Sequence, residues 1–409
     1  MDQRVQDWLR ELTSTPTAAG HERRVIAWVE RWLAGREGLT RRDDEHGNIE
    51  IALDPNLGQD GAGGPAFREG PPVYFTAHMD HPAFVVHRVI GPGTLELAFR
   101  GGVMEDYFPD ARVVIHTTDG RRLGGAITGR GDLSDPDKSW LCDLDEEDES
   151  VTTADFATWD LPEAEIVSEP LPGVGGEPGE IIYTNACDDL AAVVAALAAL
   201  DRLRELRAAG ESVHDSRVLL TRAEEIGFIG AIGASRGGFM PAGSRVIALE
   251  NSRSFDDSPI GGGPIVRVGD RVSVFAPSLT GAVAKVAERI SGGSAHVTAS
   301  QKLSEGPKWR WQRKLMAGGA CEASVYCHFG YEATCVCLPL GNYHNMADLA
   351  AVQAGTNTTR PRVGREHVAI SDFEGMVELL VGCGRDLPGT GGLGERLAKL
   401  WEDRKQVLA

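Results

Sequence analysis

The sequence of 409 residues has no hydrophobic run that approaches the roughly 18–20 residues needed to span a bilayer. Its first residues alternate apolar and charged side chains at helical spacing, which is not the pattern of a signal peptide. Basic residues are also scarce, since 41 lysines and arginines stand against 60 aspartates and glutamates, a net charge of −19. Such a charge disfavours binding to nucleic acids and to anionic membranes, and we expect neither as a partner.

Cysteine is scarce as well. The seven cysteines are odd in number and scattered over the chain, which fits a reducing cytoplasm better than a disulfide scaffold. The sequence also lacks a glycine-rich phosphate loop and a Gly-x-Ser-x-Gly nucleophile elbow. Catalysis by a serine or cysteine nucleophile therefore has no local sequence context. We expect a cytoplasmic protein whose chemistry depends on other groups.

Most of the chain alternates between strand and helix patterns. This alternation predicts an α/β fold, in which strands form one sheet and helices cover it. The predicted strands are 48–53, 73–77, 216–225, 244–250 and 333–340, and the main predicted helices are 188–206, 278–291, 321–329 and 371–387.

Residues 86–179 have a different pattern. Period-two alternation prevails there, helical periodicity is almost absent, and Asp119-Gly120 stands where a hairpin turn is expected. We therefore predict a discontinuous α/β domain formed by residues 1–85 and 180–409, with an inserted β-domain at 86–179.

The predicted strand at 73–77 ends in a concentration of ionisable side chains. The stretch YFTAHMDHPAFVV (74–86) contains three such side chains within four consecutive positions, namely His78, Asp80 and His81. In open α/β sheets, functional groups collect beyond the carboxyl ends of strands. Two histidines and three carboxylates suit two divalent ions that share one carboxylate, and one further acid is left as a base. The other candidate positions at element ends are Asp188, Glu224, Glu225, Glu250 and His344.

The order and wording of these motifs resemble the glutamyl aminopeptidases, or tetrahedral aminopeptidases, a family of metallopeptidases with two co-catalytic zinc ions. The matching segments are AHMD, NACDDLAAV, RAEEIGFIGA, ALEN and LPLGNYHN, and the similarity runs over nearly the whole chain. The insertion at 86–179 lies where this family carries its small β-domain. The resemblance implies a central mixed sheet sandwiched between helices, with an inserted small β-barrel.

The resemblance also implies a set of metal ligands. One divalent ion would be held by His78, Asp188 and Glu250, and the other by Asp188, Glu225 and His344. Zinc is the expected metal, with cobalt and manganese as alternatives. The family usually has aspartate at the position of Glu250, but glutamate is only one methylene longer and can still chelate.

Catalysis would depend on two further acids. Asp80 would accept the second ring N–H of His78 and so fix the tautomer of that ligand. Glu224 would be the general base for a hydroxide that bridges the metals, and would pass its proton to the leaving amine. The implied activity is removal of N-terminal residues from peptides. The expected partners are peptide substrates and further copies of the chain, up to a dodecamer.

Two features stay open. The family more often has an acid after the aspartate at position 80, and we interpret His81 as a pocket or supporting residue rather than a ligand. The basic-aromatic segment PKWRWQRK (307–314) either lines a specificity pocket or forms a surface or subunit contact.

Two other functions compete with the aminopeptidase. A dinuclear amidohydrolase, deacylase or carboxypeptidase would keep the metals and change the substrate. The lid insertion that such enzymes carry is missing from its expected place between Glu250 and His344. A metal-free scaffold would keep only the fold and would be expected to lose ligands or the base, yet all of them are present. We therefore expect a dinuclear metal aminopeptidase.

Overall fold

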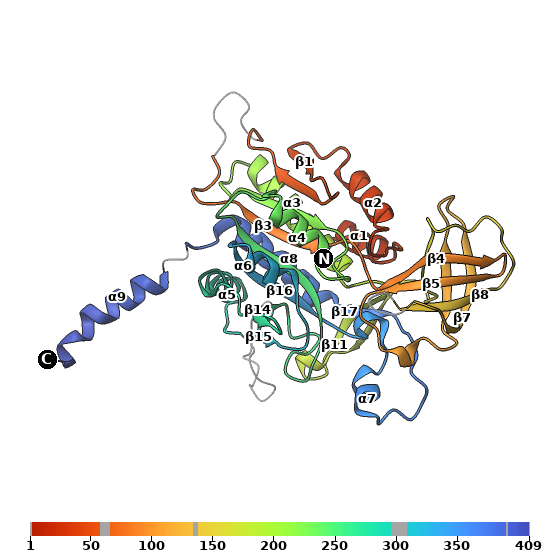
Figure 1. The fold of residues 1–409 in the computed structure, drawn as a ribbon. Coiled ribbons are helices and arrows are strands. Elements are labelled where there is room, and N and C mark those ends of the chain that lie inside the picture. The colour runs from red at the N-terminus through yellow and green to blue at the C-terminus, as the bar shows by residue number, and fades with distance from the viewer. Residues whose placement is uncertain (1, 58–65, 134–137, 296–308, 390–391, 409) are drawn as a thin grey trace.

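The computed structural model describes residues 2–57, 66–133, 138–295, 309–389 and 392–408. A main body is built around an eight-stranded sheet, and a closed β-barrel stands to one side of it (Figure 1). The predicted α/β fold, with a mixed central sheet between helices and a small β-barrel, is confirmed. None of the helices described is long and apolar enough to cross a membrane.

The central sheet is mixed. In spatial order its strands are β1 (Leu39–Asp43), β2 (Ile49–Leu53), β12 (Ser216–Thr221), β3 (Val73–His78), β13 (Arg245–Arg253), β16 (Glu332–Leu340), β14 (Ile265–Asp270) and β15 (Gln312–Met316). The four strands β12, β3, β13 and β16 run parallel, so their carboxyl ends meet at one edge. Every residue of β3 is buried, as expected for a central strand covered on both faces.

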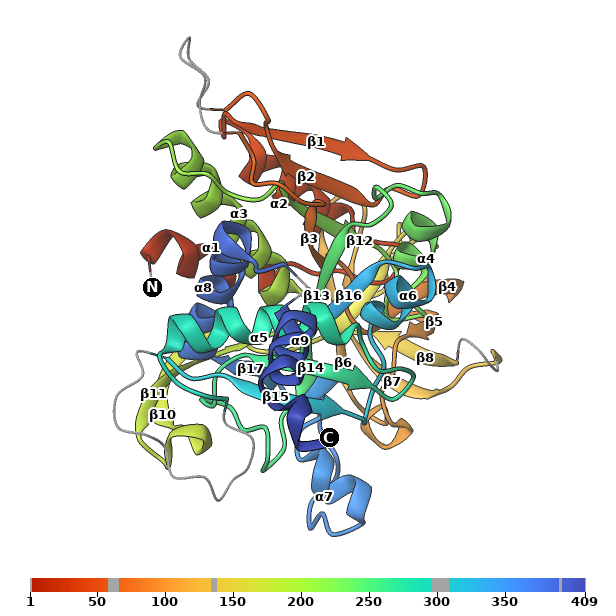
Figure 2. The same cartoon turned by 90° about the vertical axis from the view of Figure 1, so that its left-hand side faces the viewer.

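Helices cover both faces of this sheet. The largest core cluster joins α1, α2, α3, α5 and α8 to one face, and a second cluster joins α4 and α6 to the other (Figure 2). The first three turns of the long helix α3 are buried, which explains why they are apolar all round, and its charged residues lie in the remaining turns. These helices are α1 (Gln3–Thr13), α2 (Arg23–Leu33), α3 (Leu190–Ala208), α4 (Ile229–Arg236), α5 (Pro277–Ser291), α6 (Glu322–His328) and α8 (Ile370–Asp386).

The barrel closes through six antiparallel strands. In spatial order they are β4 (Ala83–Gly91), β5 (Thr94–Arg100), β8 (Ser139–Leu144), β7 (Arg122–Arg130), β6 (Arg112–His116) and β9 (Phe156–Trp159). Aromatic side chains fill its interior, with Phe108 stacked on Trp140 at 4.1 Å between ring centroids. The hairpin predicted at Asp119-Gly120 is confirmed, since this pair lies between β6 and β7 and Gly120 has a φ of 93°.

A third sheet lies at the return from the barrel to the body. It consists of β10 (Glu165–Pro170), β11 (Pro178–Thr184) and β17 (Glu366–Ala369). The antiparallel pairing of β11 with β17 joins this return to a segment near the end of the chain. The division of the chain into 1–85, 86–179 and 180–409 stays a prediction.

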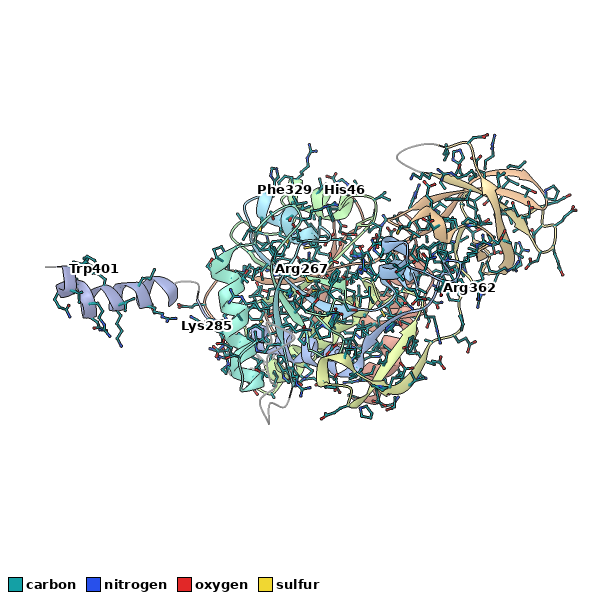
Figure 3. All side chains as sticks on the ribbon, turned by 90° about the horizontal axis from the view of Figure 1, so that it is seen from below. His46, Arg267, Lys285, Phe329, Arg362 and Trp401 are labelled. Carbon is teal, nitrogen blue, oxygen red and sulfur yellow. The ribbon has the colours of Figure 1, made fainter. Side chains whose placement is uncertain are left out.

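Two helices extend outside these layers. α7 (Leu349–Ala354) follows the 3-10 turn at Tyr343–Asn345, and α9 (Gly392–Arg404) leads away from the body, with Trp401 on its far part (Figure 3). Shorter 3-10 turns occupy Glu105–Tyr107, Pro172–Val174 and Lys405–Leu408.

Candidate metal centre

The candidate ligands meet at the carboxyl edge of the parallel strands. His78 is the last residue of β3, and Thr221, which ends the neighbouring β12, is its partner in register. The strand predicted at 216–225 thus ends four residues early, because Ala223 adopts a φ of 52° that turns the chain. Glu224 and Glu225 therefore lie in this turn rather than in a strand.

Asp188 lies at the centre of the cluster. His78 Nε2 is 3.3 Å from Asp188 Oδ1, and His344 Nε2 is 3.5 Å from Asp188 Oδ2. Glu225 Oε1 is also 3.5 Å from His344 Nε2. In two sets of three, His78–Asp188–Glu250 and Asp188–Glu225–His344, the potential ligand atoms lie within 4.8 Å of one another. The two oxygens of Asp188 thus face different histidines, as a ligand shared by two ions requires.

Glu224 lies beside these two sets. Its Oε2 is 3.8 Å from His78 Nε2, and it forms a third compact group with His78 and Glu225. Its side chain is buried, so a proton that it holds is shielded from bulk water.

The cluster has the properties expected of a cation site. Asp188 Oδ1, Glu225 Oε1 and Glu250 Oε1 are buried and have no hydrogen-bond partner among the described residues. Buried carboxylate oxygens without partners are costly, and a divalent cation would compensate all three. Histidine nitrogens and carboxylate oxygens are ligands that zinc accepts. The residues present therefore fit the implied metals.

The pKa values also show that the buried carboxylates of this cluster lack compensating positive charge. Burial raises the pKa of Glu224, Glu225 and Glu250 well above the usual range, and neighbouring carboxylates add to the effect in each case. Burial also opposes ionisation of Asp188, but the neighbouring His344 and His78 outweigh it and lower the pKa of Asp188. A bound cation would favour the ionised form of all four acids.

Asp80 supports the centre through the backbone. Its Oδ1 accepts the N–H of Glu224 at 2.9 Å, and its Oδ2 accepts the N–H of Glu225 at 3.0 Å. His78 Nδ1 lies 3.1 Å from the carbonyl oxygen of Asp80 and 3.6 Å from its Oδ1. With the proton on Nδ1, the lone pair of Nε2 points at the cluster. Asp80 thus holds the turn that carries both glutamates as well as the ring of His78.

We expect Asp80→Asn to lower kcat/KM by about 10- to 100-fold, because the asparagine NH₂ would face one of the two backbone N–H groups that the carboxylate now accepts. Peptide hydrolysis and metal content would be measured together, with thermal unfolding as the control for folding. Unchanged kcat/KM and unchanged metal affinity would contradict the positioning role.

Two acids that the sequence analysis did not single out also hold the site. Glu366 Oε2 accepts the N–H groups of Cys187 and Asp188 at 2.7 and 3.0 Å, and its Oε1 accepts the N–H of His344 at 2.8 Å. One buried carboxylate thus ties the loop of Asp188 to the loop of His344. The only available signal was a glutamate in a short apolar strand, which is not specific.

Asp189 is the second of these acids. Its Oδ1 accepts the side-chain N–H of Asn251 at 2.7 Å, and its Oδ2 lies 3.3 Å from the backbone N–H of His78. It therefore connects the ends of three elements. Asp189 and Asn251 belong to the quoted motifs NACDDLAAV and ALEN, so their neighbourhood could have indicated this role.

His81 lies next to the centre but outside the compact ligand sets. Its Nδ1 bonds the carbonyl oxygen of Asp188, and its Nε2 is 2.9 Å from Asn345 Oδ1. Because both ring nitrogens already have partners, the geometry agrees with a supporting residue rather than a ligand.

A family model described as M42 glutamyl aminopeptidase matches residues 64–132. The resemblance to the M42 glutamyl aminopeptidases is confirmed. The matched segment contains His78 and Asp80 and the first part of the barrel, and the other candidate residues lie beyond it. A search of curated proteins found no match.

Solved structures of TET peptidases and of a further archaeal aminopeptidase have a similar fold. The TET1 peptidase of Pyrococcus horikoshii is 18% identical with a TM-score of 0.67, over 94% of this chain and 100% of that one. An aminopeptidase from the archaeon Desulfurococcus kamchatkensis is 19% identical with a TM-score of 0.68, over 94% and 95%. A TET aminopeptidase from a marine sediment Thaumarchaeota archaeon is 16% identical with a TM-score of 0.69, over 96% and 99%. At these identities the likeness establishes the fold.

A cavity of about 380 Å³ adjoins the candidate metal centre. Its walls include Glu250, Arg267, Phe255 and Met316. The basic-aromatic segment predicted at 307–314 does not line this cavity where it is described. Residues 307 and 308 lie outside the described part, and Trp309 and Arg310 line a different cavity of about 540 Å³ together with Asp372. The specificity-pocket interpretation of this segment therefore has no support from the described residues.

Proposed function

We propose that the chain is an M42-type metalloaminopeptidase, which removes N-terminal residues from peptides with the help of two divalent ions. The observation that carries the proposal is the shared position of Asp188, whose two carboxylate oxygens face His78 and His344. A purely structural carboxylate would be expected to bond backbone or side-chain donors, whereas three carboxylate oxygens in this cluster lack such partners among the described residues.

The proposed division of labour follows from the site. His78, Asp188 and Glu250 would hold one ion, and Asp188, Glu225 and His344 the other. The ions, when bound, would polarise the scissile carbonyl and lower the pKa of water. Glu224 would take the proton from the attacking water and hand it to the leaving amine, since it lies beside the two sets built around Asp188 and belongs to neither of them. Zinc is the metal that we propose, with cobalt and manganese as alternatives.

The cavity beside Glu250 suggests which N-terminal residue is preferred. Arg267 lies in the interior of the body (Figure 3), and its side chain is buried. Its Nη1 donates to Ser252 Oγ at 3.2 Å, and among the described residues its Nε has no hydrogen-bond partner and its guanidinium forms no ion pair with a carboxylate. A buried guanidinium without a counter-ion is costly, and an aspartate or glutamate side chain of a substrate would pair with it. We propose a preference for acidic N-terminal residues.

Replacing Arg267 by methionine tests this preference. We expect R267M to lower kcat/KM for an N-terminal glutamate by about 10- to 100-fold, because one charge-assisted bond is lost. Hydrolysis of an N-terminal leucine should not fall. Arg253→Met is the matched control, since Arg253 lines the same cavity but its Nη1 already bonds Gln353 at 2.6 Å. An equal loss for both substrates would refute the pairing.

The activity itself is tested by mass-spectrometric sequencing of a mixed peptide pool. The purified protein would be assayed as isolated, after chelation, and after zinc or cobalt is restored. Metal-dependent ladders shortened from the N-terminus support the proposal. Intact peptides with two metals bound would instead indicate a deacylase or another amidohydrolase, and intact peptides without bound metal would indicate a scaffold.

We also propose that the chain assembles with copies of itself. The TET1 peptidase of Pyrococcus horikoshii can assemble into a tetrahedron or a large octahedral shell. Light scattering on the purified protein tests this, and a monomer would contradict it. The cytoplasmic location remains a prediction from the cysteine content.

A further inference from the structure

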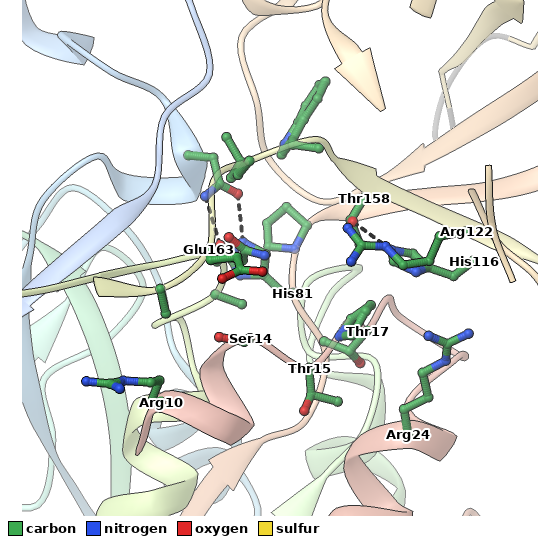
Figure 4. Close-up of a pocket in the computed structure, with 18 residues that line it drawn as sticks. Arg10, Ser14, Thr15, Thr17, Arg24, His81, His116, Arg122, Thr158 and Glu163 are labelled. Carbon is green, nitrogen blue, oxygen red and sulfur yellow. Dashed lines mark hydrogen bonds between the residues drawn. The ribbon is translucent and has the colours of Figure 1, made fainter. Parts of the chain in front are cut away.

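A cavity of about 430 Å³ lies between the barrel and the body (Figure 4), and its lining includes His81, whose ring bonds the carbonyl oxygen of Asp188. Its walls include α1, the chain that follows it, α2, the ends of the barrel strands β6, β7 and β9, and the loop residues Asn185 and Asn345. Neither the resemblance nor the proposed reaction assigns a role to it. The only acidic side chain among its lining residues is Glu163.

Two arginines from different parts of the fold gather at one end of this cavity. Arg24 belongs to α2, and Arg122 begins β7 in the barrel. Arg24 Nη2 donates to the carbonyl oxygen of Thr117 at 3.1 Å, and neither arginine forms an ion pair with a described residue. Figure 4 places both near His116, and Glu163 towards the opposite end. In a chain with a net charge of −19, this is a local excess of positive charge.

The nearest acid does not neutralise this end. The negative charge of Asp155 favours the charged form of Arg24. The two oxygens of Asp155, however, already accept the backbone N–H groups of Thr118 and Thr152, each at 2.7 Å. Its carboxylate is therefore already used to hold the barrel loops. The guanidinium groups keep most of their donors available.

His116 lies in the field of the same two arginines. Its ring is buried, its Nε2 is 2.9 Å from Thr158 Oγ1, and its Nδ1 has no partner among the described residues. Burial, and then the positive charges of Arg24 and Arg122, lower the pKa of His116 to about 3. Two guanidinium groups thus converge without an ion-pair partner among the described residues, beside a neutral imidazole, which is the arrangement that an anion would relieve.

We propose that this cavity binds a small anionic molecule through a phosphate or carboxylate group, held by Arg24 and Arg122. A guanidinium fork can bind two oxygens of either group in a bidentate manner. The remaining volume is lined by Ser14, Thr15 and the apolar side chain of Leu161. It leaves room for a ligand larger than a bare ion. The site does not depend on the proposed peptidase activity.

Binding of inorganic phosphate and of succinate, measured by titration calorimetry on the full-length protein, tests the proposal. Both are used at constant ionic strength against chloride. We expect saturable binding of at least one of them, weakened at least tenfold in the Arg24→Gln/Arg122→Gln double variant. Arg23→Gln is the matched control, because Arg23 is an exposed neighbour on α2 that does not line the cavity.

The comparison between variants separates this site from the metal centre, which all of them retain. Thermal unfolding without added anion checks that each variant folds, and Arg122→Gln alone serves if the double variant does not. Tighter binding of phosphate or of succinate identifies the group that the site recognises. Absence of saturable binding, or equal binding by the wild type and the arginine variants, would overturn the proposal.

Discussion

Glu224→Gln should lower kcat by about 10²- to 10⁴-fold while bound metal remains. General-base catalysis contributes a factor of this size, and glutamine cannot accept the proton from water. Glu224 belongs to neither of the two sets built around Asp188, so its amide should leave both sets intact. Steady-state hydrolysis of a peptide and metal analysis of the same sample measure the two properties together.

Glu225→Gln is the matched comparison, because it changes the adjacent residue in the same turn. Glu225 lies 3.5 Å from His344 and belongs to a ligand set, so its variant should lose metal as well as activity. If Glu224→Gln kept full turnover, the proposed general base would be wrong. If it lost metal as readily as Glu225→Gln, its placement outside the two sets built around Asp188 would be wrong.

The fold could be predicted to the extent that it depends on local patterns. The parallel strands are short apolar runs, and their order along the chain places His78, Glu224 and Glu225 near one edge. The barrel was visible as a change of period from helical to alternating. The pairing of β11 with β17 was not predictable, because it joins Thr184 to Glu366, which lie far apart in the sequence.

The site could be predicted less completely than the fold. Histidines and carboxylates at the ends of strands can be recognised in the sequence. The hydrogen bonds that hold them in place involve backbone groups from separate loops, which the sequence does not show. Glu366 accepts N–H groups of Asp188 and His344, and no pattern in a single sequence records such a contact. Asp80 was predicted to orient His78, whereas its carboxylate makes its closest contacts with the turn that carries the two glutamates. The bridging position of Asp188 depends on side-chain directions that only the folded chain defines.

Asp188→Asn should have the widest effect of any single change at the centre. The substitution keeps the shape of the side chain and removes the charge that both ligand sets share. We expect kcat/KM to fall by at least about 10³-fold, which corresponds to about 4 kcal/mol of transition-state stabilisation. Both ions should be bound more weakly, and metal titration followed by mass spectrometry measures this.

Glu250→Gln separates a shared ligand from an unshared one. Glu250 belongs only to the set with His78, so Asp188, Glu225 and His344 would remain to hold one ion. Its variant should therefore lose one ion while Asp188→Asn weakens two, although both changes convert a buried carboxylate to an amide. Equal metal content in the two variants would show that Asp188 is not shared, and the two-ion centre would have to be replaced by a single site. A difference of one ion would instead show that the two carboxylate oxygens of Asp188 serve different ions, and that both ions depend on this residue.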